Sequence, residues 1–332
     1  MVEPILRAVH TPDEVLADAV LYLKIVFGGG LFTYAYSMCI YTLRACGDGS
    51  RPLIFLAFSC LSNIALDLVF VKYLEMGVAG AAVGTVIAES LATLMCLVYI
   101  KKKMPFLGVG REDICNTKKD VTFYVLKLSL PTCLQVGAVS FCSILVQSVI
   151  NHYGTVVVAG YAAAVKLEQV VNMIINALTG ALNTFTAQNR GAGYFDRIGQ
   201  GSHMVNRLMI VLTLAVSLFI FLTGKFLLGL FVSDADGVQV VSEGYFYLQI
   251  TCGFYIILGM EQAYMAVLRG MADVLMPLVI GCIQILVNLS AIWLLEPHFG
   301  KAGIWWSVVI SWTFCLTAAK IRIRKYDLEV NV

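Results

Sequence analysis

Leu43 to Leu53 reads LRACGDGSRPL, and a diverged copy of this stretch, LRGMADVLMPL, occupies Leu268 to Leu278, 225 residues later (268 − 43). The two copies share a leucine and an arginine at the start, an aspartate in the middle, and a proline and a leucine at the end. The same offset relates Asn63 to Asn288. Because both stretches lie between long apolar runs, they indicate an internal duplication of a helical unit.

The composition of the chain is typical of a membrane protein. Hydrophobic residues make up 59% of the 332 residues and charged residues only 13%, whereas soluble domains carry about 25% charged residues. That leaves too little polar surface to cover a water-soluble particle of this size. The ten cysteines lie mostly in apolar runs without metal-ligand spacing, which predicts packing residues and no disulfides. The net charge of +2 gives no reason to expect a nucleic acid as partner.

Nine apolar runs are long enough to cross the hydrocarbon core of a bilayer, which takes about 20 helical residues. They lie near residues 19–43, 53–73, 78–100, 124–150, 156–187, 205–232, 240–267, 275–295 and 302–320. The sequence therefore predicts an all-α polytopic membrane protein. Its predicted parts are an N-terminal lobe of three spans (1–103), a polar cytoplasmic linker (104–122) and a C-terminal lobe of six spans (123–332).

The distribution of lysine and arginine predicts which loops are cytoplasmic, since these residues accumulate on that side. They fall mainly on one set of alternate loops, which includes the C-terminal end. We therefore expect a multi-pass protein of the inner membrane with a cytoplasmic C-terminus. The duplication pairs the first span with the seventh, so the three spans over 124–232 have no counterpart in the N-terminal lobe. The expectation is thus nine of twelve helices, with the first three of that lobe lacking.

Several stretches resemble the multidrug and toxic compound extrusion (MATE) family of secondary antiporters in their order and spacing. They are the first copy quoted above, NIALDLVF (63–70), MGVAGAAVGTVIAE (76–89), GTVVVAGYAAAVKLEQV (154–170) and FTAQNRGAG (185–193). The resemblance implies two six-helix lobes around a cavity that opens alternately to either face. It implies export of small organic cations, driven by a proton or sodium gradient without a bound cofactor. Flippases of lipid-linked oligosaccharides share this fold and are one alternative; a truncated, non-transporting remnant is another.

Asp67 is the strongest candidate for a functional residue, because a carboxylate in the middle of a span costs about 2.5–3.5 kcal/mol on insertion scales. Asn63 lies one helical turn earlier on the same face, and Thr85 in the next span is within reach. At the duplicated positions Asn288 is kept, but Ile292 replaces the acid. We expect Asp67, Asn63 and Thr85 to bind the coupling proton or sodium ion; the alternative is an interhelical hydrogen bond. The resemblance implies the same site, completed by an aspartate on a first helix that is lacking here.

Five further polar residues are candidates for the substrate cavity. They are Glu261, Gln262, Tyr22, Ser37 and Glu89. Glu261 could attract cationic substrates or pair with another helix. Lys166 and Glu168 are close enough in sequence that we expect them to neutralise each other or cap a helix bend. Where some MATE members carry an acid on the first helix of the second lobe, this chain has Gln135 and Gln147, which argues against a coupling site in that lobe.

The repeated stretches themselves are predicted to have structural roles. Asp48 and Asp273 stand shortly before Pro52 and Pro277, a pattern that suits the first turn of a helix. The three glycines at 28–30 predict close helix packing or a kink. The sequence contains no nucleophile beside a base and no metal-ligand cluster, so we do not expect an enzyme or a metal site, apart from sodium at Asp67.

Overall fold

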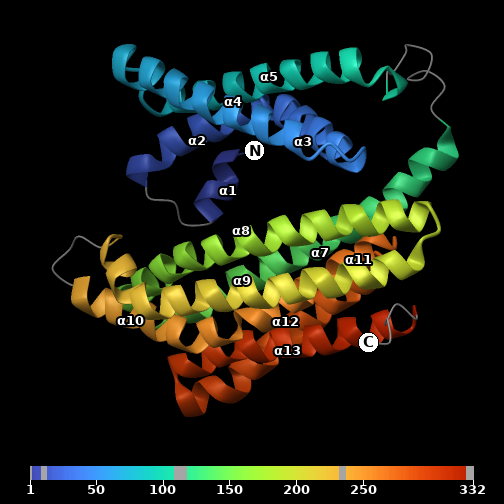
Figure 1. The fold of residues 1–332 in the computed structure, drawn as a ribbon. Coiled ribbons are helices and arrows are strands. Elements are labelled where there is room, and N and C mark those ends of the chain that lie inside the picture. Colours follow the sequence, from blue (N-terminus) through green and yellow to red (C-terminus); the bar gives the residue numbers. More distant parts are fainter. Residues whose placement is uncertain (1, 9–12, 108–117, 232–236, 327–332) are drawn as a thin grey trace. The chain divides into compact units, whose positions relative to one another are not determined.

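The computed structural model describes residues 2–8, 13–107, 118–231 and 237–326. Within these ranges every regular element is helical (Figure 1). Eight helices are long and apolar enough to cross a membrane, and a bent helix pair brings the number of spans to nine. The predicted all-α, polytopic architecture is confirmed. The chain divides into two compact units, unit 1 (Met1–Thr117) and unit 2 (Lys118–Val332), which are described separately.

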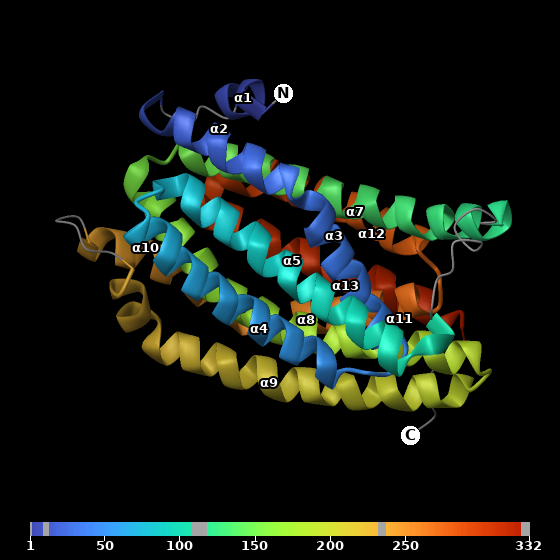
Figure 2. The same ribbon diagram turned by 90° about the horizontal axis from the view of Figure 1, so that it is seen from above.

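Unit 1 is arranged around its last long helix. Its helices are α1 (Val2–Ala8), α2 (Asp13–Gly28), α3 (Gly30–Ala45), α4 (Ser50–Asp67) and α5 (Gly77–Lys103). A π-helical segment, Leu68–Tyr73, continues α4, and a 3-10 turn, Pro105–Leu107, follows α5. Helix α5 packs against α2, α3 and α4 and lies between α3 and α4 in Figure 2. Its buried positions are mostly small residues, such as Gly80, Ala82 and Ala88, which let neighbouring helix backbones approach closely.

The first predicted span, 19–43, is a bent pair of helices. Residues Leu16–Gly28 and Gly30–Ala45 meet at an angle of 50°. Gly29 lies at the bend, and a Cβ atom at this position would lie 2.5 Å from Cγ1 of Val86 on α5. The glycine therefore allows the kink and the close approach of α5 at the same point, as the run of glycines predicted.

Unit 2 contains seven helices around a larger core. They are α7 (Lys119–Asn151), α8 (Thr155–Gly191), α9 (Phe195–Gly229), α10 (Gly237–Thr251), α11 (Tyr255–Gly270), α12 (Leu275–Phe299) and α13 (Lys301–Arg324). Helices α10 and α11 form one apolar span interrupted by a 3-10 turn, Cys252–Phe254, where the sequence predicted a single helix over 240–267. Trp305 and Tyr255 are fully buried at the centre of this core.

The two copies of the repeated stretch fold in the same way. At the end of α3 the backbone N–H of Asp48 donates to the carbonyl oxygen of Leu43 at 2.9 Å, and at the end of α11 Asp273 donates to Leu268 at 2.9 Å. This bond is the one that closes a Schellman motif and satisfies a carbonyl at a helix C-terminus. The duplication is therefore preserved in the backbone hydrogen bonds of both helix ends.

The aspartate of each copy then joins three helices. Its Oδ1 accepts the backbone N–H three residues later, from Arg51 at 3.1 Å in unit 1 and from Met276 at 3.4 Å in unit 2, as expected for a helix start. Its Oδ2 accepts a hydrogen bond from a tyrosine hydroxyl, that of Tyr99 on α5 in unit 1 and that of Tyr326, just after the end of α13, in unit 2. The Tyr99 hydroxyl lies 3.0 Å from Asp48, and the Tyr326 hydroxyl lies 2.8 Å from Asp273. We call these two arrangements the aspartate clamps.

Candidate functional site

Asn63, Asp67 and Thr85 lie together between α4 and α5. The side-chain amide of Asn63 donates to Oδ1 of Asp67 at 3.3 Å and to Oγ1 of Thr85 at 3.3 Å. The Thr85 hydroxyl donates to the Ala81 carbonyl of its own helix at 3.0 Å, so its oxygen is turned toward Asn63 as an acceptor. The structure thus brings together the three residues that the sequence grouped. We call them the Asp67 triad.

Asp67 stands nearer the end of its span than the sequence suggested. It is the last residue of α4, and the span ends at Tyr73, so the predicted position in the middle of the span is wrong. The backbone after Asp67 widens into the π-helical segment, in which the Leu74 N–H donates to Val69 at 2.9 Å, five residues back. Such segments are frequent at functional sites, and hydropathy gave no signal of this one.

The carboxylate of Asp67 rests directly on the backbone of α5. A Cβ atom at Gly84 would lie 2.5 Å from Oδ1 of Asp67, so a larger residue at position 84 would displace the acid. Within the described ranges no lysine, arginine or histidine forms an ion pair with Asp67. The Asn63 amide thus donates to a carboxylate oxygen of Asp67 and to the hydroxyl oxygen of Thr85, and the acid lies against the backbone of α5. Such a set of oxygen ligands suits a proton or a hard monovalent cation.

The other candidates in unit 1 lie outside the triad. Glu89, one turn after Thr85 on α5, accepts a hydrogen bond from the Thr33 hydroxyl of α3. It therefore connects two helices. Ser37 is half-buried on α3 and Tyr22 is exposed on α2; neither takes part in the hydrogen bonds of the triad.

Glu261 and Gln262 lie on α11 in unit 2. Glu261 is buried in the interior, with 3% of its surface exposed, and Gln262 is half-buried. Neither residue lines the two cavities described next. The structure thus places Glu261 in the packed interior of the unit.

Unit 2 encloses a polar cavity of about 250 Å³. Side chains from α7, α8, α10, α12 and α13 line it, among them Tyr161, Glu168, Tyr247, Asn288 and Trp312. The sequence did not predict this cavity. One of its lining residues, Asn288, was nevertheless singled out by the repeat as the counterpart of Asn63.

Glu168 does not pair with Lys166. The Tyr247 hydroxyl donates to Oε2 of Glu168 at 2.5 Å, whereas the ammonium group of Lys166 lies 5.5 Å from the centre of the Phe231 ring. The predicted neutralisation of Glu168 by Lys166 is therefore wrong. The two residues are only two apart in sequence, and positions so spaced on a helix do not face each other.

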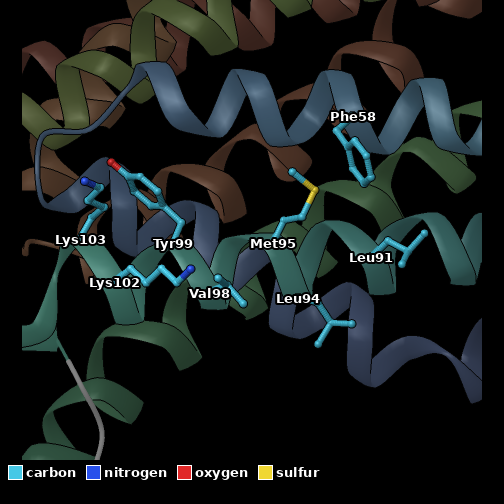
Figure 3. A pocket seen from close by; sticks show the side chains of 8 residues that line it. All are labelled: Phe58, Leu91, Leu94, Met95, Val98, Tyr99, Lys102 and Lys103. Carbon is cyan, nitrogen blue, oxygen red and sulfur yellow. The ribbon is translucent and has the colours of Figure 1, made fainter.

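The larger cavity, of about 490 Å³, is an apolar groove between α4 and α5 (Figure 3). Figure 3 shows Phe58 reaching from α4 and Met95 rising from α5, with Lys102 and Lys103 at one end of the groove. No carboxylate lines it. The groove thus offers no acid that would bind a cation, and the candidate site is the Asp67 triad.

Comparison with known proteins identifies the family of the chain. A model of the MatE family matches residues 1–69 and 131–294, well over half of the chain. The chain belongs to the MatE family. MatE proteins are transporters, so the residues described above belong to a protein of a transporter family.

Two curated MatE relatives cover nearly the whole chain. It is 31% identical to the probable multidrug resistance protein YpnP of Bacillus subtilis, over 97% of this chain and 71% of the relative. It is 23% identical to the multidrug export protein MepA of Staphylococcus aureus, over 93% of this chain and 67% of the relative. The chain thus spans about two thirds to three quarters of the length of these proteins.

Solved structures of MatE-type transporters share the fold. A transporter of the MOP superfamily from Pyrococcus furiosus matches with a TM-score of 0.91 at 18% identity, covering 99% of this chain and 74% of that protein. The outward-facing conformation of a multidrug resistance MATE transporter matches with a TM-score of 0.90 at 19% identity. The match covers 98% of this chain and 73% of that protein. At this level of identity the likeness concerns the fold alone.

Proposed function

We propose that this MatE protein exports small organic cations in exchange for protons or sodium ions, and that the Asp67 triad binds the coupling ion. The observation that carries the proposal is the environment of Asp67. A carboxylate inside a membrane span accepts a hydrogen bond from Asn63, which also donates to Thr85, and lies against Gly84. Within the described residues it has no cationic partner. Intramembrane acids of this kind mark ion pathways in transporters.

The triad suits reversible ion binding because its members are neutral apart from the acid. A proton on Asp67 would neutralise the carboxylate, and the Asn63 amide would still have the Thr85 oxygen as acceptor. A sodium ion would instead be held by oxygens of Asp67, Asn63 and Thr85, the ligand type that hard cations prefer. In either case the bound ion removes the negative charge from the span. The energy cost of a charged carboxylate in the span is thereby coupled to the ion gradient.

The proposed orientation is that of a multi-pass protein of the inner cell membrane whose C-terminus lies in the cytoplasm. Arginines at the ends of α3, α11 and α13 support it, since basic residues favour the cytoplasmic side. We also propose the division into an N-terminal lobe (1–103), a linker (104–122) and a C-terminal lobe (123–332). The end of α5 at Lys103 supports the first bound, and α7 begins at Lys119, so its first residues fall within the proposed linker. Residues 108–117 of this linker lie outside the described ranges.

The alternative of a flippase for lipid-linked oligosaccharides requires a basic cavity for the pyrophosphate group. The enclosed cavity of unit 2 is lined by Glu168 and by no lysine or arginine. This charge favours cationic substrates over anionic ones.

The test is efflux of ethidium from cells that produce the unmodified chain, Asp67→Asn or the control Asp196→Asn. Asp196 is an exposed aspartate in the first turn of α9. We expect the unmodified chain and the Asp196→Asn control to export ethidium. Asp67→Asn should lose this export although it is equally abundant in the membrane. Imposed proton or sodium gradients across proteoliposomes then identify the coupling ion. Unchanged export by Asp67→Asn would contradict the assignment of the triad. Absence of export by the unmodified chain would contradict the function itself and point to a non-transporting protein.

A further inference from the structure

The polar cavity of unit 2 contains an acid without a counter-charge. Glu168, on α8, accepts the Tyr247 hydroxyl at 2.5 Å, and within the described ranges no lysine, arginine or histidine forms an ion pair with it. Tyr247 is itself buried, with 2% of its surface exposed. A carboxylate in such surroundings is unfavourable unless a cation or a proton joins it. An occupant that carries a positive charge would therefore be favoured beside Glu168.

A second acceptor in the same cavity also lacks a partner. The side chain of Asn288, on α12, is 6% exposed, and its Oδ1 accepts no hydrogen bond from the described residues. Buried polar atoms are nearly always hydrogen-bonded in folded proteins. Because Asn288 lines the cavity together with Glu168, an occupant that carries N–H donors and a positive charge would satisfy both groups at once.

Part of the remaining wall is aromatic, and the other lining residues are mostly aliphatic. The Tyr161 ring stacks on Trp305 with centroids 5.2 Å apart and planes 10° apart, and it meets Tyr247 edge-on at 5.2 Å. Trp312 contributes a second large ring to the lining. Aromatic rings bind both hydrocarbon groups and cations. A bare metal ion would make no use of this wall.

We propose that this cavity binds a small organic ammonium ion, whose N–H groups contact Glu168 and Asn288 and whose hydrocarbon part lies against Tyr161 and Trp312. The volume of about 250 Å³ is just below the range of about 300–1,000 Å³ that is usual for drug-sized ligands. The expected ligand is therefore an arylalkylamine of about the size of benzylammonium. The inference rests on the proposed export of organic cations and adds a site and a size class to it.

The experiment measures binding of benzylammonium to the full chain in lipid nanodiscs by isothermal titration calorimetry. Benzyltrimethylammonium keeps the charge but has no N–H group, and benzyl alcohol has no charge. We expect benzylammonium to bind, benzyltrimethylammonium to bind at least tenfold more weakly, and benzyl alcohol not to bind. Glu168→Gln should weaken benzylammonium binding at least tenfold. The matched control is Glu296→Gln, because Glu296 also accepts a tyrosine hydroxyl, that of Tyr153 at 2.7 Å, but lies outside the cavity.

A second variant keeps the test decisive if Glu168→Gln fails to fold. Asn288→Ala removes the unpartnered acceptor and should weaken benzylammonium binding several-fold while the melting temperature stays close to that of the unmodified chain. Equal affinity of the folded variants and the unmodified chain would overturn the inference, as would binding of sodium without binding of benzylammonium. Ethidium export that depends on Asp67, without benzylammonium binding, would remove this inference and leave the proposed function intact.

Discussion

Gly47 and Ala272 hold the same position in the two sequence copies, 225 residues apart (272 − 47), and both have left-handed backbones, with φ of 86° and 52°. Each residue follows the last turn of a helix, where the Schellman motif requires such a conformation. Glycine adopts it freely, whereas a residue with a Cβ atom is strained there by about 1–2 kcal/mol. The second copy thus retains the geometry of the first with a less suitable residue.

Ala272→Gly should stabilise the protein, because it removes this strain at a position where the backbone already has the required conformation. The gain is expected to be up to about 1 kcal/mol, since glycine also loses more entropy on folding. Gly47→Ala should destabilise it by a similar amount. Thermal unfolding of the detergent-solubilised variants, followed by tryptophan fluorescence, measures both changes. If the melting temperature shifted in the same direction for both substitutions, the left-handed position after each helix would not explain the effects.

Asp273→Asn should destabilise the protein more than Asp48→Asn. Asp273 is only 9% exposed and accepts Nε of Arg322 at 2.7 Å in addition to the Tyr326 hydroxyl. Asp48 receives no arginine side-chain donor from the described residues. Hydrogen bonds to charged groups contribute about 1.5–3 kcal/mol, so we expect a loss of about 2 kcal/mol at Asp273 and a smaller loss at Asp48. Chemical unfolding in mild detergent compares the two, and an equal loss would contradict this ranking.

The contribution of Asp273 should also depend on pH. Burial raises the pKa of Asp273, but the hydrogen bonds from Arg322 and Tyr326 lower it more, so the pKa lies below its ordinary value. A group whose pKa is lowered by folding stabilises the protein above its unfolded pKa, about 3.9 for aspartate, and ceases to do so as the pH falls through the folded value. The difference in melting temperature between the unmodified chain and Asp273→Asn should therefore be constant from pH 7 to about pH 5. It should shrink only below about pH 4.

Gly84→Ala should impair ion coupling although every member of the Asp67 triad remains. The added Cβ would lie 2.5 Å from Oδ1 of Asp67, so the carboxylate must move away from Asn63 and Thr85. We expect ethidium export to fall severalfold, toward the level of Asp67→Asn. Gly28→Ala is the control, since a Cβ atom there meets no atom within 4 Å. Full export by Gly84→Ala would show that export does not depend on the position of the Asp67 carboxylate against α5.

The sequence predicted those features that depend on one helix or on the repeat. Long apolar runs predicted the nine spans, and the spacing of Asn63 and Asp67 placed both residues on one helix face. The partners of an acid on another helix could not be predicted in this way. Glu168 and Tyr247 are 79 residues apart, and their contact depends on how α8 and α10 pack. For the same reason sequence neighbours suggested the wrong partner, Lys166.

Helices α4 and α5 are joined at two levels, by the aspartate clamp near one end and by the Asp67 triad toward the other. Thr85 lies 14 residues from Tyr99 on α5 (99 − 85). At a rise of 1.5 Å per residue, the two residues are about 20 Å apart along the helix axis. If α5 rotates relative to α4 about the aspartate clamp, a 1 Å increase in their separation at the Asp67 triad corresponds to a rotation of about 3°. In unit 2 the same contact exists at Asp273, but Ile292 replaces the acid at the position that corresponds to Asp67. The two helix pairs therefore share the aspartate–tyrosine contact, and under the proposed function the pair in unit 1 also carries an acid whose charge changes when the coupling ion binds.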